Sequence, residues 1–396
     1  MKIAHINGVY RTGSTGRLIS DLVEYGKKSG HESRVFYSEG KENAPEAKRY
    51  ITNYERNLHA VLSRVSGLQG YWSKIATRRL IGELQHFRPD VVHLHVVHGN
   101  CLNLPLLFDW LIRLKVGVVV TLHDCWWFTG RCAHPLYYSC DHYQSHCVDC
   151  PAKRDVCPSW LFDRAEKMRK DKEMWLCSLP RLKVVAVSHW GVKVANESFL
   201  GKKSVACIYN WVDTETFYPT KHDALRQEMK LTGEKVILGV ASRWNDQKGL
   251  GDLIWLAEQL PKCTVVIVGE MDQNVRLPAN MILVPSTDDK KKLAQLYCMA
   301  DVFVNPSRME TFGLTTVEAM ACGTAAIVYD VTACPELIGP DTGLVVPAQA
   351  GVEGLLKATQ ELLNNPADSE LCVRWVRENF SFNVGAKQYY QIYSDI

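Results

Sequence analysis

Short apolar segments rich in β-branched residues alternate with longer amphipathic segments along this chain of 396 residues. The short segments are typical of strands buried on both faces of a sheet, and the longer ones have the periodicity of helices. This alternation predicts parallel sheets covered by helices on both faces, and therefore an α/β fold. In the first half of the chain, we expect strands at residues 2–7, 33–38, 90–97, 116–123, 182–188 and 203–210.

The alternation is interrupted by a turn-like segment, "NWVDTETFYPTKHD", at residues 210–223, and it then resumes. We therefore expect two α/β domains, residues 1–212 and 213–375. A C-terminal helix at residues 376–396 is expected to pack across the domain boundary. In the second half of the chain, we expect strands at residues 235–242, 263–269, 280–285, 301–307 and 324–330.

The composition limits the classes of partner and the compartment. Because 46 basic residues are balanced by 43 acidic ones, the net charge of +3 is too small to predict nucleic-acid binding. The amino terminus lacks the apolar core of a signal peptide, and no apolar run approaches the roughly 18 residues that span a bilayer. We therefore expect a cytoplasmic protein in which most of the 14 cysteines are reduced thiols or metal ligands.

Ligands of open parallel α/β sheets bind beyond the carboxyl ends of the strands, so the residues that follow each strand are candidate site residues. Gly13 and Gly16 follow the first expected strand and precede a helix, where backbone N–H groups can hold a phosphate. Glycine-rich turns of purely structural importance are also common at such positions. Arg243 and Lys248 follow the strand at 235–242, and their charges suit two linked phosphates, although basic loop residues are usually only solvated.

Two glutamates, Glu310 and Glu318, flank a Phe-Gly pair where the strand at 301–307 leads into a helix. If the intervening residues were helical, the carboxylates would lie about 12 Å apart along the axis, which is roughly the reach from one sugar to another across a diphosphate. Each carboxylate could then accept hydrogen bonds from paired hydroxyls. Alternatively, Glu310 interacts with the helix dipole and Glu318 faces solvent. The spacing alone leaves both interpretations open.

The segment "ETFGLTTVEAMACGTAAIV" resembles the E-x-F-G-x-x-x-x-E signature of the family-4 retaining glycosyltransferases. The segments "ADVFVNPS", "SRWNDQKG" and "YNWVDTETFYP" are similar to other motifs of that family, and the resemblance covers essentially the whole chain. It implies a GT-B fold, in which two Rossmann-like domains with mostly parallel sheets face each other across a cleft. The segments "VVHLHVVHGNCLNL" and "TLHDCWWFTGRCAH" look like the branch found in exopolysaccharide gene sets, including colanic-acid-type enzymes.

The resemblance implies a function for each matching residue. Glu318 would hold the nucleotide ribose, whereas Arg243 and Lys248 would neutralise the diphosphate. Glu310 would orient the donor sugar. The other donor-binding positions that the resemblance implies are Gly13, Gly16, Phe312, Gly313 and Leu314.

The implied reaction is transfer of a hexose from a nucleoside-diphosphate sugar to a glycan or lipid-linked acceptor, with retention of anomeric configuration. The leaving phosphate would accept the proton of the acceptor, and the basic side chains make a catalytic metal or other cofactor unnecessary. Two alternatives are a GT-B sugar epimerase and a non-catalytic partner subunit that binds a nucleotide sugar or a glycan.

Three histidines lie on or just after strands of the first domain. By resemblance, His123 matches a histidine at the acceptor side of the cleft, although a lone histidine after a strand is more often structural. His93 and His95 point the same way along one expected strand, so we expect them to support the site from one polar face of the sheet.

Four cysteines, Cys132, Cys140, Cys147 and Cys150, form the pattern C-x7-C-x6-C-x2-C within an aromatic, cysteine-rich insert at residues 125–160. A C-x-x-C supplies two thiolates to one tetrahedral ion, and two more sulfurs would complete a structural zinc site. The spacing of the first pair is irregular, and His134, His142 and His146 could substitute as ligands. Free thiols and disulfides are the alternatives to a zinc site. In each of these cases, we expect the insert to lie near the acceptor and to influence acceptor choice.

The segment "GYWSKIATRRLIGELQ" at residues 70–85 combines Trp72 with Lys74, Arg78 and Arg79. Such a segment can lie on the anionic inner surface of a membrane, which would suit a lipid-linked acceptor. An ordinary amphipathic surface helix explains the pattern equally well.

Overall fold

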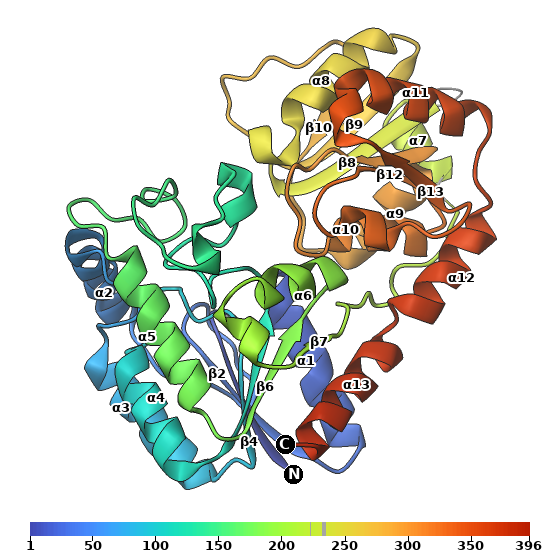
Figure 1. The fold of residues 1–396 in the computed structure, drawn as a ribbon. Helices are drawn as coiled ribbons and strands as arrows, with labels where there is room; N and C mark the ends of the chain where they lie inside the picture. The colour runs from blue at the N-terminus through green and yellow to red at the C-terminus, as the bar shows by residue number, and fades with distance from the viewer. Residues whose placement is uncertain (222, 232–234) are drawn as a thin grey trace. The chain divides into compact units, whose positions relative to one another are not determined.

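The computed structural model describes residues 1–221, 223–231 and 235–396, and the chain divides into two compact units (Figure 1). Unit 1 comprises residues 1–208 and 386–396, and unit 2 comprises residues 209–385. The chain therefore returns to unit 1 near its end. Residue 222, in the turn-like segment expected between the domains, lies outside the described residues.

Unit 1 is built on a parallel sheet with the strand order β3-β2-β1-β4-β5-β6-β7. Strand order reverses between β1 and β4, because β2 and β3 lie on one side of β1 whereas β4 to β7 lie on the other. Loops that follow β1 and β4 therefore meet at a topological switch point, where ligands of such sheets bind. The strands are β1 (Lys2–Asn7), β2 (Glu32–Tyr37), β3 (Ala47–Arg49), β4 (Val91–Leu94), β5 (Gly117–Leu122), β6 (Leu182–Ala186) and β7 (Val205–Cys207).

Helices cover both faces of this sheet (Figure 1). On one face, Leu80, Leu107 and Trp175 pack with Val92 and Val120 of the sheet in one apolar cluster, which buries α3, α4 and α5 against the strands. The helices of unit 1 are α1 (Gly13–Lys28), α2 (Asn53–Ser66), α3 (Lys74–Phe87), α4 (Leu104–Leu114), α5 (Ala165–Ser178) and α6 (His189–Asn196), together with the last part of α13 (Phe382–Ser394).

On the other face, α13 packs against α1 and the sheet. The Tyr390 hydroxyl donates to the carbonyl of Leu22 at 3.0 Å, and a Cβ at Gly26 would lie 1.8 Å from that hydroxyl oxygen. Gly26 is therefore required for this close approach. The C-terminal tyrosines thereby become part of the core of unit 1.

The loop between β5 and α5 carries the cysteine-rich insert. It contains only two short 3-10 turns, Pro135–Tyr138 and His142–Gln144, among its described residues. Lys172 of α5 is 1% exposed, and its ammonium donates to the carbonyls of Trp126 and Gly130. The same ammonium lies 3.9 Å from the centre of the Trp126 ring. The buried Lys172 side chain therefore fastens the insert to the body of unit 1.

Unit 2 has a second parallel sheet, with the strand order β10-β9-β8-β11-β12-β13 in its described residues. The strands are β8 (Lys235–Arg243), β9 (Cys263–Glu270), β10 (Met281–Val284), β11 (Val302–Asn305), β12 (Ala326–Tyr329) and β13 (Gly343–Val346). The helices are α7 (Asp223–Glu228), α8 (Leu250–Gln259), α9 (Lys290–Met299), α10 (Leu314–Ala321), α11 (Gly351–Asn364) and α12 (Ser369–Asn379).

The α/β fold expected from the alternating pattern is confirmed, and each expected strand is present. Two further strands, β3 and β13, were missed. β3 has the sequence "AKR" at the edge of its sheet, where charged residues are tolerated and no apolar run is needed. β13 begins on a glycine and is half-buried, so it lacks the pattern of a central strand. Among the described residues, none of the helices combines the length and the apolar character that crossing a bilayer requires.

Candidate active site

In unit 2, the loops after the neighbouring strands β8 and β11 bring two charged side chains together. The ammonium of Lys248 lies 2.6 Å from a carboxylate oxygen of Glu310, and these side chains are 28% and 17% exposed. Because parallel neighbours end at the same edge of a sheet, residues far apart in sequence meet at this point. The pair is partly shielded from water but still accessible, as a ligand site requires.

The backbone around Lys248 is fixed by local hydrogen bonds. The side-chain oxygen of Asn245 accepts from the N–H of Lys248 at 3.0 Å, and Gly249 follows with φ of +71°. A Cβ at Gly249 would lie 2.4 Å from the carbonyl oxygen of Pro306, so only glycine allows the two loops to approach this closely.

The loop after the neighbouring strand β12 holds the backbone of Glu310. The N–H of Glu310 donates to the Thr332 hydroxyl at 3.0 Å, and its carbonyl accepts from the N–H of Ala333 at 3.3 Å. Burial, followed by the charge of Glu310, raises the pKa of the nearby Cys334 thiol. The carboxylate therefore points into a confined space beside Lys248, and Cys334 stays a neutral thiol.

The start of α10 supplies backbone donors. Gly313 has φ of +103° and precedes Leu314, the first residue of the helix, and no side chain caps the helix at this position. The first N–H groups of a helix and its dipole favour an anion. Phe312 is 2% exposed and packs against Tyr209 and Phe380, so its side chain belongs to the core and only its backbone can contribute to a site.

Glu318 does not face solvent. It is 6% exposed, and the Tyr297 hydroxyl donates to its carboxylate at 2.9 Å. The interpretation of Glu318 as a solvated helix residue is therefore wrong, because α10 turns this position toward α9. Burial, and then the carboxylate, raise the pKa of Tyr297, so the phenol keeps its proton and remains a donor.

Arg243 is the last residue of β8 and its side chain is exposed. Within the described part of the chain, no hydrogen bond or ion pair joins it to Lys248 or Glu310. Both cations thus lie at or after the end of β8, and Lys248 is the one that contacts Glu310.

In unit 1, the turn after β1 leads directly into α1. Gly13 begins α1 with φ of +61°, and the preceding Thr12 makes no side-chain cap hydrogen bond. Gly16 is buried, and a Cβ there would lie 3.2 Å from the backbone nitrogen of Arg11. Gly16 therefore allows the loop to fold tightly over α1, while the first N–H groups of the helix lack a side-chain cap.

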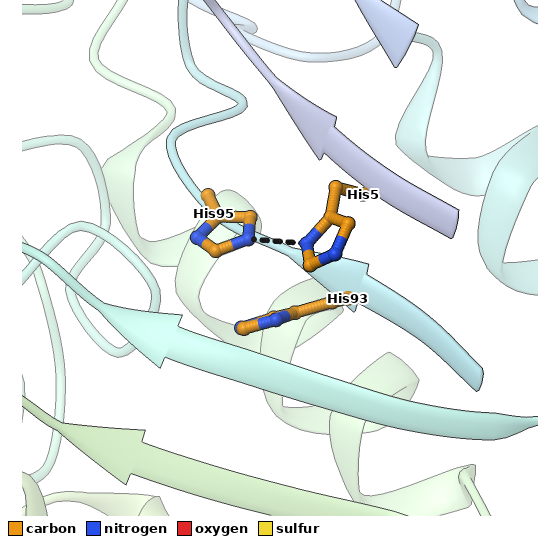
Figure 2. Close-up of side chains that lie close together, drawn as sticks. All are labelled: His5, His93 and His95. Carbon is orange, nitrogen blue, oxygen red and sulfur yellow. Dashed lines mark hydrogen bonds between the residues drawn. The ribbon is translucent and has the colours of Figure 1, made fainter. Parts of the chain in front are cut away.

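His123 follows β5 and belongs to a chain of buried imidazoles. Nε2 of His123 lies 3.1 Å from Nδ1 of His95. Nε2 of His95 in turn lies 3.2 Å from Nδ1 of His5 (Figure 2). Burial lowers the pKa of His123 to about 4 and that of His5 to about 3. All three rings are therefore neutral near pH 7, each with one donor and one acceptor nitrogen.

His93 joins the same group. Its ring centre lies 3.8 Å from that of His95, which confirms the prediction that both histidines share one face. Its Nδ1 lies 2.7 Å from the Tyr393 hydroxyl and its Nε2 lies 2.7 Å from the Thr121 hydroxyl. Burial is also the main reason why the pKa of His93 is well below its usual value.

Figure 2 shows His5, His93 and His95 close together, and one ligand atom from each lies within 4.8 Å of the others. Five of the six ring nitrogens are engaged in hydrogen bonds with one another, with His123 or with hydroxyls, and the buried Nε2 of His5 has no partner among the described residues. We therefore interpret the group as a neutral hydrogen-bonded network that orients His123, and not as a metal centre.

The sequence analysis missed two residues beside His123. Nε2 of His98 lies 2.8 Å from a carboxylate oxygen of Asp124, and both side chains are 16% exposed. Burial would raise the pKa of Asp124, but the His98 imidazole and the N–H of Trp126 together lower it to about 2. Their position just after β4 and β5 was the available signal, since polar residues at strand ends are candidate site residues.

The four cysteines of the C-x7-C-x6-C-x2-C pattern line one small cavity in the insert. In the described residues, all of them are free thiols. The predicted convergence of the four side chains is therefore present.

Two α/β units, each built on a parallel sheet, are the architecture of the GT-B class of glycosyltransferases, and this chain has that fold. The chain belongs to Glycosyltransferase Family 4, whose characteristic sequence matches residues 15–216. Residues 221–381 match a second family, described as Glycosyl transferases group 1.

Individual relatives agree with this assignment. A Klebsiella pneumoniae protein described as "Uncharacterized 41.2 kDa protein in cps region" is 27% identical over 325 residues, which are 79% of this chain and 81% of that protein. The "Putative colanic acid biosynthesis glycosyl transferase WcaC" of Escherichia coli K12 is 24% identical over 375 residues, 87% of each chain. The crystal structure of Anabaena HepE in complex with UDP and glucose has a TM-score of 0.72 and 16% identity, covering 100% of both chains, and shows the shared fold.

Proposed function

We propose that this glycosyltransferase moves a hexose from a nucleoside-diphosphate sugar to a glycan or lipid-linked acceptor during synthesis of a surface polysaccharide, with retention of anomeric configuration. The relatives from a cps region and from colanic acid biosynthesis support the polysaccharide context. The complex of HepE with UDP and glucose supports a nucleotide-sugar donor.

The observation that carries this proposal is the pair of Lys248 and Glu310 beside the start of α10. Breaking a sugar–phosphate bond leaves growing negative charge on the diphosphate. Lys248, Arg243 and the first N–H groups of α10 would stabilise that charge, because positioned donors act most strongly where charge develops. In the free protein, Glu310 holds the Lys248 ammonium at a defined place.

The two glutamates would then divide the donor between them. Glu310 would accept hydrogen bonds from the sugar hydroxyls and orient the sugar for attack. Glu318, which Tyr297 fixes by a hydrogen bond of 2.9 Å, would accept hydrogen bonds from the ribose diol. The acceptor hydroxyl would attack the donor sugar on the same face from which the diphosphate departs. The departing phosphate oxygen would take the proton of that hydroxyl. In this proposal the positive charge comes from the chain itself.

His123 would hydrogen-bond to the acceptor. Since burial lowers its pKa to about 4, the ring is neutral at working pH and orients a hydroxyl rather than protonating it. The chain through His95 and His5 would keep the imidazole in one orientation.

The test is a screen of nucleotide sugars for transfer and for hydrolysis, followed by the variants Lys248→Ala and Glu310→Ala. We expect each variant to lose activity by about 10²–10³-fold, as when one charge-stabilising contact is removed. Lys262→Ala, at an exposed lysine of the same unit, is the matched control and should retain full activity. Full turnover by either site variant would overturn the assignment.

The same screen separates the alternatives. A non-catalytic subunit would bind a donor but release no nucleoside diphosphate with or without acceptor, whereas an epimerase would return an isomerised sugar and need no acceptor. Configuration of the new linkage, read by NMR, decides whether the enzyme retains or inverts.

We further propose that unit 1 contacts the inner face of a membrane through α2. Four apolar side chains on one stripe of α2 are exposed, with fractions of 77%, 48%, 49% and 39% for Tyr54, Leu58, Val61 and Val65. They are spaced three and four residues apart and so project from one side of the helix. A stripe of this kind favours the apolar part of a lipid surface.

The neighbouring loop extends this surface. Trp160, Leu161 and Phe162 are all more than half exposed, and the N–H of Trp160 donates to the carbonyl of Arg64 in α2 at 2.7 Å. The segment at 70–85 contributes less than the sequence suggested, because Ala76, Leu80 and Leu84 are among the residues that α3 buries in the core.

A further inference from the structure

We propose that Cys132, Cys140, Cys147 and Cys150 bind one structural zinc ion that holds the insert at residues 125–160 in shape. This site is separate from the proposed glycosyl transfer, and its test does not depend on activity.

Convergence of the four sulfur-bearing side chains is the first observation. The cysteines come from a loop of irregular structure, yet all four line one cavity of about 10 Å³. A space of that size accommodates about one water-sized particle. Four cysteine ligands around a single ion are the composition of a closed structural zinc site.

Arg131 supplies a second, independent observation. It lines the same cavity and is only 1% exposed. Two of its nitrogens donate to the carbonyls of Cys157 and Gly67, whereas its Nε has no partner among the described residues. A buried donor without an acceptor is costly. A thiolate is a far better acceptor than a neutral thiol, so zinc binding would create strong acceptors around the cavity that Arg131 lines.

A backbone amide already points at one of the sulfurs. The N–H of Gly130 donates to Sγ of Cys147 at 3.2 Å. Amide donors of this kind orient metal-bound ligands and stabilise their charge.

The charges around the cavity fit a zinc thiolate site. Zinc with four thiolates carries a net charge of about −2. Arg131 lines the cavity, and the Lys172 side chain donates to the carbonyl of Gly130, which also lines it. These two basic side chains would offset part of the negative charge, beside the carboxylates of Asp163 and Glu166, which accept from the N–H groups of Cys150 and Cys147.

Zinc binds thiolates rather than thiols, so binding of the ion would release the thiol protons to solvent.

Other side chains near the cavity are less suitable ligands. Nδ1 of His142 is engaged with the carbonyl of Val148 at 2.9 Å, and the Tyr143 hydroxyl donates to Glu197 at 2.8 Å.

The four sulfurs are not yet as close together as in a zinc site. Among the described residues, the group of three possible ligands whose atoms all lie within 4.8 Å of one another is His5, His93 and His95, so no three of the sulfurs lie that close. Zinc–sulfur bonds of about 2.3 Å would draw the four side chains inward.

The first test is elemental analysis of protein purified without added zinc. We expect about one equivalent of zinc in the native chain and less than about a tenth in Cys147→Ser. The control is Cys177→Ser, at a half-buried cysteine of α5 outside the cavity, which should retain the ion. Native protein with less than about a tenth of an equivalent would overturn the proposal. Zinc that persists in Cys147→Ser would also overturn it, since the ion would then lie elsewhere.

A second measurement uses the native chain and so does not depend on how the variants fold. Cobalt replacing zinc should show the intense visible absorption of tetrahedral thiolate coordination. A thiol reagent should label four more cysteines after a chelator is added than before. Weak octahedral absorption, or a disulfide among these cysteines in non-reducing peptide mapping, would contradict a four-thiolate site.

Discussion

Acidification should destabilise unit 1 through its buried histidines. Burial lowers the pKa of His5 and of His59 to about 3 and that of His123 to about 4, although the charge of Asp124 acts to raise the last value. In the unfolded chain the same rings have a pKa of about 6.5. Because the folded state disfavours the charged form, stability is complete above about pH 6.5 and is lost as the pH falls toward about 3.

The size of the effect follows from proton uptake. At pH 5 an unfolded histidine is almost fully protonated, whereas each of these folded rings remains neutral. Each ring therefore removes roughly 2 kcal/mol from the free energy of unfolding between pH 7 and pH 5. Together, His5, His59 and His123 would remove roughly 6 kcal/mol, which is comparable with the whole stability of an ordinary domain, about 5–15 kcal/mol.

Urea denaturation at pH 7, 6 and 5, followed by circular dichroism and by hydrogen exchange of peptides from β1, β4 and β5, measures this loss. In His59→Gln the loss between pH 7 and pH 5 should shrink by roughly 2 kcal/mol, because one titrating ring is gone. His86→Gln, at an exposed histidine of α3, should leave the loss unchanged. A free energy of unfolding that stays constant over this range would refute the assignment of these rings as neutral and buried.

Two further predictions concern the membrane surface and the loop that carries Lys248. The double variant Leu58→Glu, Val61→Glu should abolish co-flotation with anionic vesicles. The control variant Leu114→Glu, at another exposed leucine of unit 1, should still co-float. Equal flotation of the native protein, the double variant and the control would exclude α2 as the contact. Gly249→Ala should destabilise unit 2 by about 2 kcal/mol or more and reduce transfer, because its φ of +71° and close packing exclude a Cβ. The control for thermal unfolding is Gly251→Ala in α8, where the added Cβ meets open space. If Gly249→Ala melted at as high a temperature as this control, the predicted strain would be contradicted.

Much of the fold could be predicted because buried parallel strands have an unmistakable local signature. The segment "KIAHIN" coincides with β1, and "KVILGVAS" differs from β8 only at its last residue. β3 and β13 lack this signature because edge strands are stabilised by one neighbour and carry charged or half-buried residues. Their existence depends on pairing with β2 and β12, which a local pattern does not reveal.

The candidate site was only partly predictable. The positions of Lys248 and Glu310 after neighbouring strands identified them as site residues, and the structure places them 2.6 Å apart. The burial of Glu318 could not be read from spacing, because it depends on which side of α10 faces α9. The bond between His98 and Asp124 was missed for a similar reason, since it joins the loops after two different strands.

The sequence by itself determined the alternation of strands and helices, the glycines of the turns and the chemical types available at each strand end, because these depend on neighbouring residues along the chain. Only the tertiary structure decided which of those groups meet. It joined His5 to His95 and His123 across three strands, and it gathered Cys132 and Cys150 around one cavity with the buried Arg131. Such contacts depend on the order of strands in the sheet and on the path of an irregular loop, and both are set by packing over the whole unit.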